Sequence, residues 1–186
     1  MVQKVSKENL LKLLKNFSTN EKKNTNSTVQ TFNVPYIKSN PDGTPIYPIK
    51  INANLRILAI GHIVSDRNNF HNERYIYAAD YYYAERFSQS VKDPNKKTWY
   101  KARIIDDGGP DPIFRVEMSD DPSIFFEGPT PSSPCFQLNK KIDEVKKKED
   151  PQTSKSCSVS GPDFFGLGTN VVQYLMQNLE GNQKIF

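Results

Sequence analysis

Few residues in this chain could support catalysis or bind a metal, and their spacing argues against both roles. His62 and His71 are the two histidines, with Asp66 and Glu73 close by in sequence. Paired zinc-binding histidines on one local element usually lie about three to six positions apart, and these two are too far apart for that pattern. We therefore predict structural, hydrogen-bonding roles for both histidines.

The cysteines and the acidic loop lead to the same prediction. Cys135 and Cys157 are too few for a disulfide framework or a cysteine-rich zinc site, which favours a reducing compartment. Cys135 adjoins a predicted helix N-terminus that could lower its pKa, but a packed or half-exposed thiol is favoured. The Asp106 to Gly109 run lacks the calcium-loop and GxxxxGK patterns and is predicted to be a β-turn. We expect no catalytic residue, metal, cofactor or small-molecule substrate.

Four arginines lie among aromatic residues and could form a surface on which nucleic-acid bases stack. They are Arg67, Arg74, Arg86 and Arg103. Acidic residues in the same segment offset the first three of them. We therefore favour arginines that are paired within the fold or at a protein interface.

The positive charge of the chain is concentrated near its N-terminus. Residues 1–30 contain six lysines and two acidic residues, so their net charge of +4 equals that of the whole chain. Weak nucleic-acid contact through this basic segment is therefore the alternative function. No apolar run reaches the roughly 18 residues that cross a bilayer, and no signal-peptide pattern begins the chain. We expect a protein that is neither secreted nor membrane-bound.

Residues 1–31 are predicted to form a segment separate from the folded module at 32–186. Ser6 is a candidate N-cap for a short amphipathic helix, which could dock into a partner's groove. Its apolar face consists of Leu10, Leu13, Leu14 and Phe17. Residues 18–31 are polar and are predicted to be a flexible linker, because they bury too little apolar surface to offset the entropy of ordering.

Residues 32–118 carry strand patterns. Extended runs at 32–36 and 46–49 flank turn residues and predict a hairpin, whereas 55–64 is predicted to be a buried central strand. Aromatic strand segments are predicted at 75–77 and 81–83. Alternation over 99–105 and 114–118, on either side of the glycine-rich turn, predicts a second hairpin.

Residues 134–179 carry helix patterns. A helix is predicted over 134–147 with Ser133 as its N-cap, followed by a polar loop at about 149–160. A second helix is predicted over 171–179, closed by Gly181. Strands with a few helices and no regular βαβ alternation predict an α+β fold.

Two aromatic-rich stretches resemble the halves of a known paired module. The order of Asp-Arg, Phe-His, Glu-Arg-Tyr-Ile-Tyr and Arg-Phe within 61–88 resembles the FYRN motif. The FYRC motif is similar to Trp-Tyr and Ala-Arg-Ile at 99–104, Ile-Phe-Arg-Val at 113–116, Phe-Glu-Gly at 126–128 and Gly-Pro-Asp-Phe-Phe-Gly-Leu-Gly at 161–168. The lead-in at 40–48 is similar to that of stand-alone members of the transforming growth factor beta regulator 1 type.

The resemblance implies one α+β module in which both halves contribute to a single antiparallel sheet flanked by helices. We place the FYRN half at about 55–95 and the FYRC half at about 98–181. The motif pair also occurs in mixed-lineage-leukaemia-type histone methyltransferases and some plant jumonji demethylases. It implies a non-catalytic nuclear protein that acts as a subunit or adaptor for chromatin-associated proteins in transcription regulation or histone modification.

The resemblance also points to residues that define the module or contact a partner, most of them expected to support the fold. They are Phe70, His71, Arg74, Tyr75, Tyr77, Arg86, Trp99, Tyr100, Arg103, Gly108, Gly109, Phe114, Phe126, Gly128, Pro134, Phe164, Phe165 and Gly166. Consecutive strand residues face opposite ways, so either Phe164 and Phe165 are both core residues or one is an exposed anchor. Ala78-Ala79-Asp80 stands where the family usually has Pro-Val-Gly, which leaves the local turn geometry open.

Overall fold

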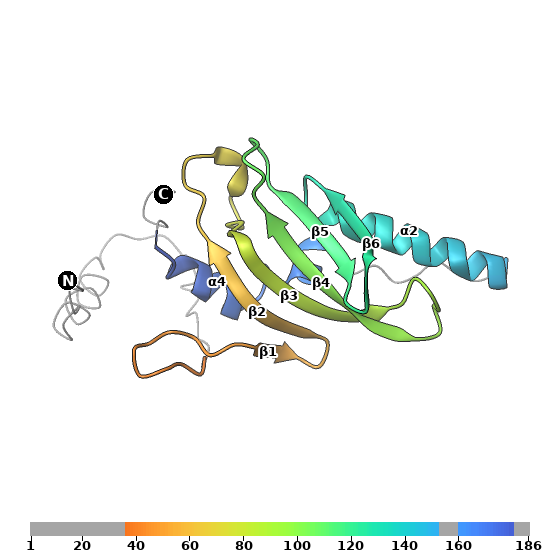
Figure 1. Cartoon of the computed structure of the whole chain (residues 1–186), viewed down its shortest axis with the longest axis horizontal. Helices are drawn as coiled ribbons and strands as arrows, with labels where there is room; N and C mark the ends of the chain where they lie inside the picture. The colour runs from red at the N-terminus through yellow and green to blue at the C-terminus, as the bar shows by residue number, and fades with distance from the viewer. Residues whose placement is uncertain (1–35, 153–159, 181–186) are drawn as a thin grey trace, which may run out of the picture. The chain divides into compact units, whose positions relative to one another are not determined.

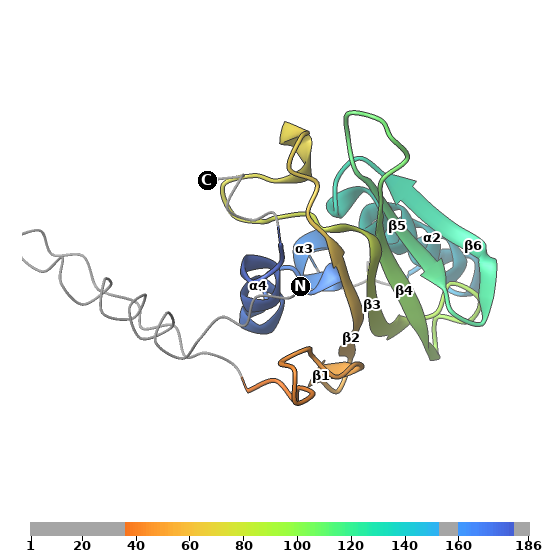
Figure 2. The same ribbon diagram turned by 60° about the vertical axis from the view of Figure 1, so that its left-hand side comes forward.

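The computed structural model describes residues 36–152 and 160–180. The expected N-terminal helix and linker, most of the polar loop, Cys157 and Gly181 lie outside the described residues. Within them, a six-stranded antiparallel sheet has its strands in chain order, β1 to β6. Three helices pack against one face of this sheet (Figures 1 and 2). The predicted α+β class, with one sheet shared by both halves of the module, is confirmed.

The strands form a meander. Their bounds are Ile49–Asn52 (β1), Leu55–His62 (β2), Ala79–Gln89 (β3), Lys97–Ile105 (β4), Ile113–Met118 (β5) and Asp121–Gly128 (β6). The hairpin predicted around the glycine-rich turn is confirmed as β4 and β5, with Ile105 opposite Ile113. Gly108 has a φ of +85° in the connecting turn, a conformation that suits glycine.

The expected strand at 55–64 exists as β2, but it is not central. It lies second from one edge, beside the short β1, and β3 and β4 occupy the middle of the sheet. The strand expected at 75–77 is also wrong, since only an isolated bridge joins Ile76 to His71 there. The side chain of Asn72 accepts the backbone N–H groups of Arg74 and Tyr75, which turns this segment instead of extending it.

Of the hairpin expected from 32–36 and 46–49, residues 32–35 lie outside the described residues, and the part from residue 36 on can be compared. Its turn forms, because the Gly43 N–H donates to the Asn40 carbonyl oxygen at 2.9 Å. A single bridge, Ser39 to Pro45, follows on the described side, and Ile49 pairs with β2 instead. Prolines have no backbone N–H to extend a ladder, which accounts for the early end of this pairing.

Strand β6 was not predicted. Ile124, Phe125 and Phe126 are three consecutive apolar residues, so the segment lacks the alternation by which strands are recognised. In the sheet, Phe126 lies opposite Val116 on the helix-covered face, and Phe125 is 44% exposed on the other face. β6 therefore carries apolar residues on both faces, and the usual alternation of apolar and polar residues is absent.

The helices predicted over 134–147 and 171–179 are present as α2 and α4, and α3 was not predicted. α2 spans Ser132–Glu149, α3 Gly161–Phe165 and α4 Asn170–Gln177; a single 3-10 turn, η1, spans Asn68–Phe70. α2 begins earlier than expected, so Ser133 lies within its first turn and is not its N-cap. α4 carries the expected apolar residues, with Val172, Leu175 and Met176 buried.

Phe164 and Phe165 lie in helix α3, not in a strand. Ser160 caps its N-terminus by accepting the Asp163 N–H, and Gly166 ends it with a φ of +80°. Because a helical turn can direct both rings toward one surface, both are buried, at 3% and 0% exposure. The exposed-anchor alternative is therefore wrong for both residues.

The core lies between the sheet and the helices. The apolar residues on this covered face are Leu55, Ile57, Tyr82, Ala84, Tyr100, Ala102, Ile104, Phe114, Val116 and Met118. Ala84 lies opposite Ala102, and these short side chains leave room for α3 to pack on β3 and β4. The buried Tyr82 hydroxyl donates to the Phe165 carbonyl oxygen at 2.6 Å and so joins the sheet to α3.

Candidate functional site: the open face of the sheet

The opposite face of the sheet carries no described helix, and we call it the open face. Its residues are Arg56, Tyr81, Tyr83, Glu85, Phe87, Trp99, Lys101, Arg103, Arg115, Glu117, Phe125 and Glu127. They alternate along each strand with the core residues, so the same strands that build the core also position this surface. Figure 1 shows the sheet with this face toward the viewer and α2 behind it.

Charged residues form rows across the open face. The register places Arg56, Glu85, Lys101 and Glu117 side by side on β2 to β5. The Arg56 Nε lies 2.5 Å from the Glu85 carboxylate. Glu117 is only 7% exposed and has Lys101 at 3.7 Å as one of its cationic neighbours. Positive and negative charges therefore alternate along this row.

Three arginines lie over aromatic rings of the same face. Arg56 is 4.5 Å from the ring centre of Trp99, Arg103 is 5.2 Å from that of Tyr83, and Arg115 is 4.4 Å from that of Phe125. A nucleic-acid base would have to displace a guanidinium to stack on these ring faces. Arg, Trp and Tyr are instead the residue types that dominate protein interfaces energetically.

The backbone is strained at the start of β3, where β3 pairs with the end of β2; we call this segment, Asp80 and Tyr81, the strained corner. Asp80 and Tyr81 have φ values of +39° and +55°, in the left-handed region that non-glycine residues rarely adopt. Gly61 lies across from them, and a Cβ there would be 2.5 Å from the Ala79 carbonyl oxygen. The turn geometry left open at Ala78-Ala79-Asp80 is thus one in which Asp80 takes the left-handed conformation. The Asp80 side chain accepts the backbone N–H of Asp106 at 3.3 Å.

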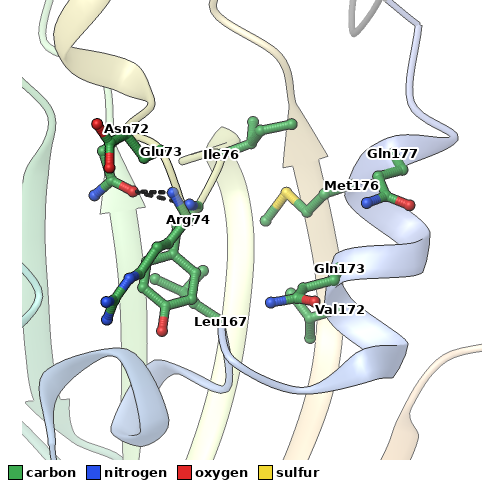
Figure 3. A pocket seen from close by; sticks show the side chains of 10 residues that line it. Asn72, Glu73, Arg74, Ile76, Leu167, Val172, Gln173, Met176 and Gln177 are labelled. Atoms are coloured by element: carbon green, nitrogen blue, oxygen red, sulfur yellow. Dashed lines mark hydrogen bonds between the residues drawn. The ribbon is translucent and has the colours of Figure 1, made fainter. Parts of the chain in front are cut away.

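A hollow of about 170 Å³ lies between the 72–76 segment and α4. Figure 3 shows Arg74 on one wall and Gln173 and Met176 on the other. Its apolar lining includes Leu167 and Val172, both buried. A space of this size and composition suits one apolar side chain rather than a cofactor, because ligand pockets are usually about 300 Å³ or more.

The residues predicted to define the module fall into four places. The buried ones are Phe70, Tyr77, Tyr100, Phe114, Pro134, Phe164, Phe165 and Gly166. Two more, Phe126 and Arg86, also face the helix-covered side. Gly108, Gly109 and Gly128 lie in turns or at a strand end. Arg74 and Tyr75 line the hollow, and His71 forms the isolated bridge with Ile76 beside it. Trp99 and Arg103 lie on the open face. Only the last two belong to the candidate site.

Sequence reasoning missed most of the open face. Arg56, Glu117 and Phe125 were not predicted as site residues. The prediction followed aromatic motifs, and the members of these motifs mostly build the core. A usable signal existed, since the positions that alternate with Tyr100, Ala102 and Ile104 are those of the open face.

The predicted pairing of arginines within the fold is confirmed for Arg67 and Arg86, whose contacts are partly buried. Arg67 forms a salt bridge with Asp106 and lies 4.6 Å from the ring centre of Phe70. The hydrogen bond from Arg67 holds the pKa of the Asp106 carboxyl below its usual value. Arg86 donates to the Phe164 carbonyl oxygen at 3.3 Å, whereas Arg74 is exposed.

Cys135 and the histidines show no sign of reactivity. Cys135 is 3% exposed, and burial raises the pKa of its thiol to about 12, the reverse of a helix-lowered value. His62 is exposed, and the buried Nδ1 of His71 makes no hydrogen bond with a described residue, contrary to the predicted role. Among residues 36–152 and 160–180, no group of three or more His, Cys, Asp or Glu is placed to hold a metal ion. No helix in these ranges is long and apolar enough to cross a membrane.

Comparison with known proteins identifies both halves. Residues 46–107 match the family model FYRN, F/Y-rich N-terminus, and residues 111–186 match FYRC, F/Y rich C-terminus. The two matches meet in the β4–β5 turn. The first therefore contributes β1 to β4, and the second contributes β5, β6 and the three helices.

Curated relatives carry the same region within longer proteins. Transforming growth factor beta regulator 1 of Homo sapiens is 30% identical over 80% of this chain and 34% of its own length, and that of Mus musculus is 32% identical over 76% and 33%. Histone-lysine N-methyltransferase TRX1 of Oryza sativa subsp. japonica is 28% identical over 92% of this chain but only 17% of its own length. The chain thus spans about a third of the regulator proteins and less of the methyltransferase. Both family models match the chain, and the two matched halves form one sheet. The chain therefore belongs to the FYRN/FYRC family of FY-rich proteins.

Proposed function

We propose that the chain is a non-catalytic nuclear adaptor that binds chromatin-associated proteins through the open face. The observation that carries this proposal is an uncovered sheet face on which Trp99, Tyr83 and Phe125 are each flanked by an arginine. Such aromatic and arginine anchors typically supply most of the binding energy of a protein interface. The names of the relatives, which include histone methyltransferases, support chromatin as the setting.

The match to the methyltransferases also supports a role other than catalysis. It covers 12% of Histone H3-lysine(4) N-trimethyltransferase ATX1 of Arabidopsis thaliana, so most of that enzyme lies outside the shared region. The three glutamates of the open face each form an ion pair with an arginine of the same face. Association with a partner is therefore the activity that this face supports best.

The test compares partner capture by the wild-type chain and by a double variant, Trp99→Ala with Phe125→Ala. Both proteins are tagged and incubated with nuclear extract, and the bound proteins are quantified by mass spectrometry. We expect the variant to lose a defined set of chromatin proteins at least about tenfold, because interface anchors commonly contribute 2 kcal/mol or more.

The matched control is Phe136→Ala, which removes an aromatic side chain that is 71% exposed on α2, away from the open face. It should capture the same proteins as the wild-type chain. Thermal melts must show that all three proteins are folded. Equal capture by the double variant would rule out the open face as the partner surface.

Nucleic-acid binding is the second candidate, and it rests on the six lysines of residues 1–30. If phosphate contacts drive it, affinity for duplex DNA should fall steeply between about 50 mM and about 200 mM salt and vanish when residues 1–30 are removed. Fluorescence anisotropy with a labelled duplex measures both effects. Binding that is insensitive to salt or to the deletion would exclude this function.

A further inference from the structure

One arginine of the open face lacks the hydrogen bonds that the others make. Side chains of Arg56, Arg67, Arg86 and Arg115 each donate to a carboxylate or a carbonyl oxygen. Arg103 donates to no described residue, and its nearest carboxylate oxygen, on Glu117, lies 3.7 Å from Nη1. A guanidinium has five N–H donors, so most of the hydrogen-bonding capacity of Arg103 is unused.

The neighbours of Arg103 leave its positive charge poorly compensated. Arg115 lies directly opposite it on β5, and like charges in that position are normally unfavourable. Arg115 pairs with Glu127, but Arg103 must share Glu117 with Lys101. The register therefore places Arg103 beside the like charge of Arg115 and leaves it to share one carboxylate with Lys101. One further anion at Arg103 would complete the pairing.

A hollow of about 240 Å³ opens beside Arg103. It is lined by Asp80, Tyr81, Tyr83, Arg103, Ile104 and Ile105. Tyr81 is 72% exposed and sits at a φ of +55°, which costs roughly 1–2 kcal/mol for a residue with a side chain. Strained backbone that holds an aromatic ring out to solvent is a feature of binding sites rather than of cores.

We propose that Arg103 binds the carboxylate of an aspartate or glutamate side chain from an acidic partner segment, with Tyr81 and Tyr83 flanking it. This inference rests on the proposed function and names the chemistry of the partner. Carboxylate–arginine pairs form two parallel N–H···O bonds. The Nε of Arg103 is buried, so the carboxylate would bind the two Nη groups of this partly exposed side chain. A singly charged carboxylate fits better than a phosphate dianion, because the carboxylates of Asp80 and Glu117 lie nearby.

The test uses the full chain, isotopically labelled, and N-acetyl-glutamate amide as the probe. Nuclear magnetic resonance follows the Arg103 Nε–H and Tyr81 backbone signals during titration at pH 7. We expect saturable shifts with this probe and shifts at least fivefold smaller with N-acetyl-glutamine amide, which has the same shape without the charge. Inorganic phosphate at equal ionic strength should bind more weakly than the carboxylate, and stronger phosphate binding would overturn the proposal.

Two variants separate binding from folding. Arg103→Gln should abolish saturation, whereas the matched control Arg74→Gln, which alters an exposed arginine beside α4 and away from the open face, should keep the affinity within about twofold. Tyr81→Gly relieves the backbone strain while removing the ring, so it should weaken binding without lowering the melting temperature. Unchanged titration in Arg103→Gln would overturn the proposal.

The outcomes distinguish this inference from the proposed function. If partner proteins are captured but Arg103→Gln neither weakens capture nor alters the titration, the adaptor role stands and the carboxylate site is wrong. If the probe binds at Arg103 but the double variant at Trp99 and Phe125 still captures every partner, the carboxylate site stands and the broader face is not the interface.

Discussion

The two faces of the sheet are built from the same six strands but are stabilised differently. On the covered face, fully buried side chains such as Tyr82, Ile57 and Phe114 pack against the helices. On the open face, neighbouring residues such as Tyr83 and Arg115 are half-buried and are held by ion pairs and ring contacts within the sheet. The comparison shows that alternate positions in one strand can serve stability and recognition separately.

This separation has a physical basis. Core packing is sensitive to a single methylene group, so the covered face tolerates little change without loss of stability. Partly exposed ion pairs contribute little net stability, typically below about 1 kcal/mol each. The open face can therefore change its partner-binding residues without endangering the fold.

The largest difference in stability between the two faces is expected for a matched pair of phenylalanine truncations. Phe165→Ala should lower the free energy of unfolding by about 3–5 kcal/mol, because it empties a fully buried site. Phe125→Ala, on the open face, should cost less than about 1 kcal/mol, because that side chain is 44% exposed. Urea unfolding followed by tryptophan fluorescence measures both. Equal losses would mean that the open face is part of the core.

A second pair removes one hydroxyl from adjacent residues that face opposite ways. Tyr82→Phe should cost about 1–3 kcal/mol, since it leaves the buried Phe165 carbonyl oxygen without its 2.6 Å partner. Tyr83→Phe should change stability by less than about 0.5 kcal/mol, because its half-exposed ring keeps its contact with Arg103. Denaturation midpoints compare the two variants, and a larger loss for Tyr83→Phe would contradict the assignment of the faces.

The strained corner permits a smaller and more specific test. Asp80→Gly and Asp80→Ala both remove the carboxylate, but only alanine retains a Cβ at a φ of +39°. The glycine variant should therefore be more stable by about 1 kcal/mol. At the exposed Ser123 of β6 the order should reverse, because glycine loses more entropy in an ordinary strand. The same order at both positions would show that Asp80 is not strained.

The smallest expected effect is a pH dependence at the Arg67 and Asp106 pair. The pKa of Asp106 is lowered in the folded protein, so its stabilisation is present above the ordinary pKa of about 4 and is lost as pH falls through the lowered value. Melting temperatures should fall less between pH 5 and pH 3 in Asp106→Asn than in the wild-type protein. Parallel curves would show that this pair does not contribute to acid sensitivity.

Most of the sheet could be predicted, because alternation and turn chemistry are local. The β4–β5 hairpin was found from Tyr100, Ala102 and Ile104 and from the glycine turn that follows. Strand β6 and helix α3 could not be found in this way. The first carries consecutive apolar residues, and the second is a single helical turn whose two phenylalanines fit a strand equally well.

The candidate site was less predictable than the fold. Its residues become neighbours only through strand register, as with Arg103 and Arg115, which lie 12 positions apart in sequence and directly opposite in the sheet. The left-handed backbone at Tyr81 has no sequence signature either, since tyrosine is an unusual residue for that conformation. Motif resemblance selects the residues that families share, and here those are mainly core residues.

The order of the strands has a consequence for biosynthesis. Every strand pairs with its neighbour in sequence, so the sheet can assemble by successive hairpins as the chain leaves the ribosome. Its apolar side must nevertheless wait for α3, since the Tyr82 contact to Phe165 closes a loop of 83 residues. The nascent chain therefore exposes the apolar face of its sheet to solvent until α3 has been synthesised and can cover it.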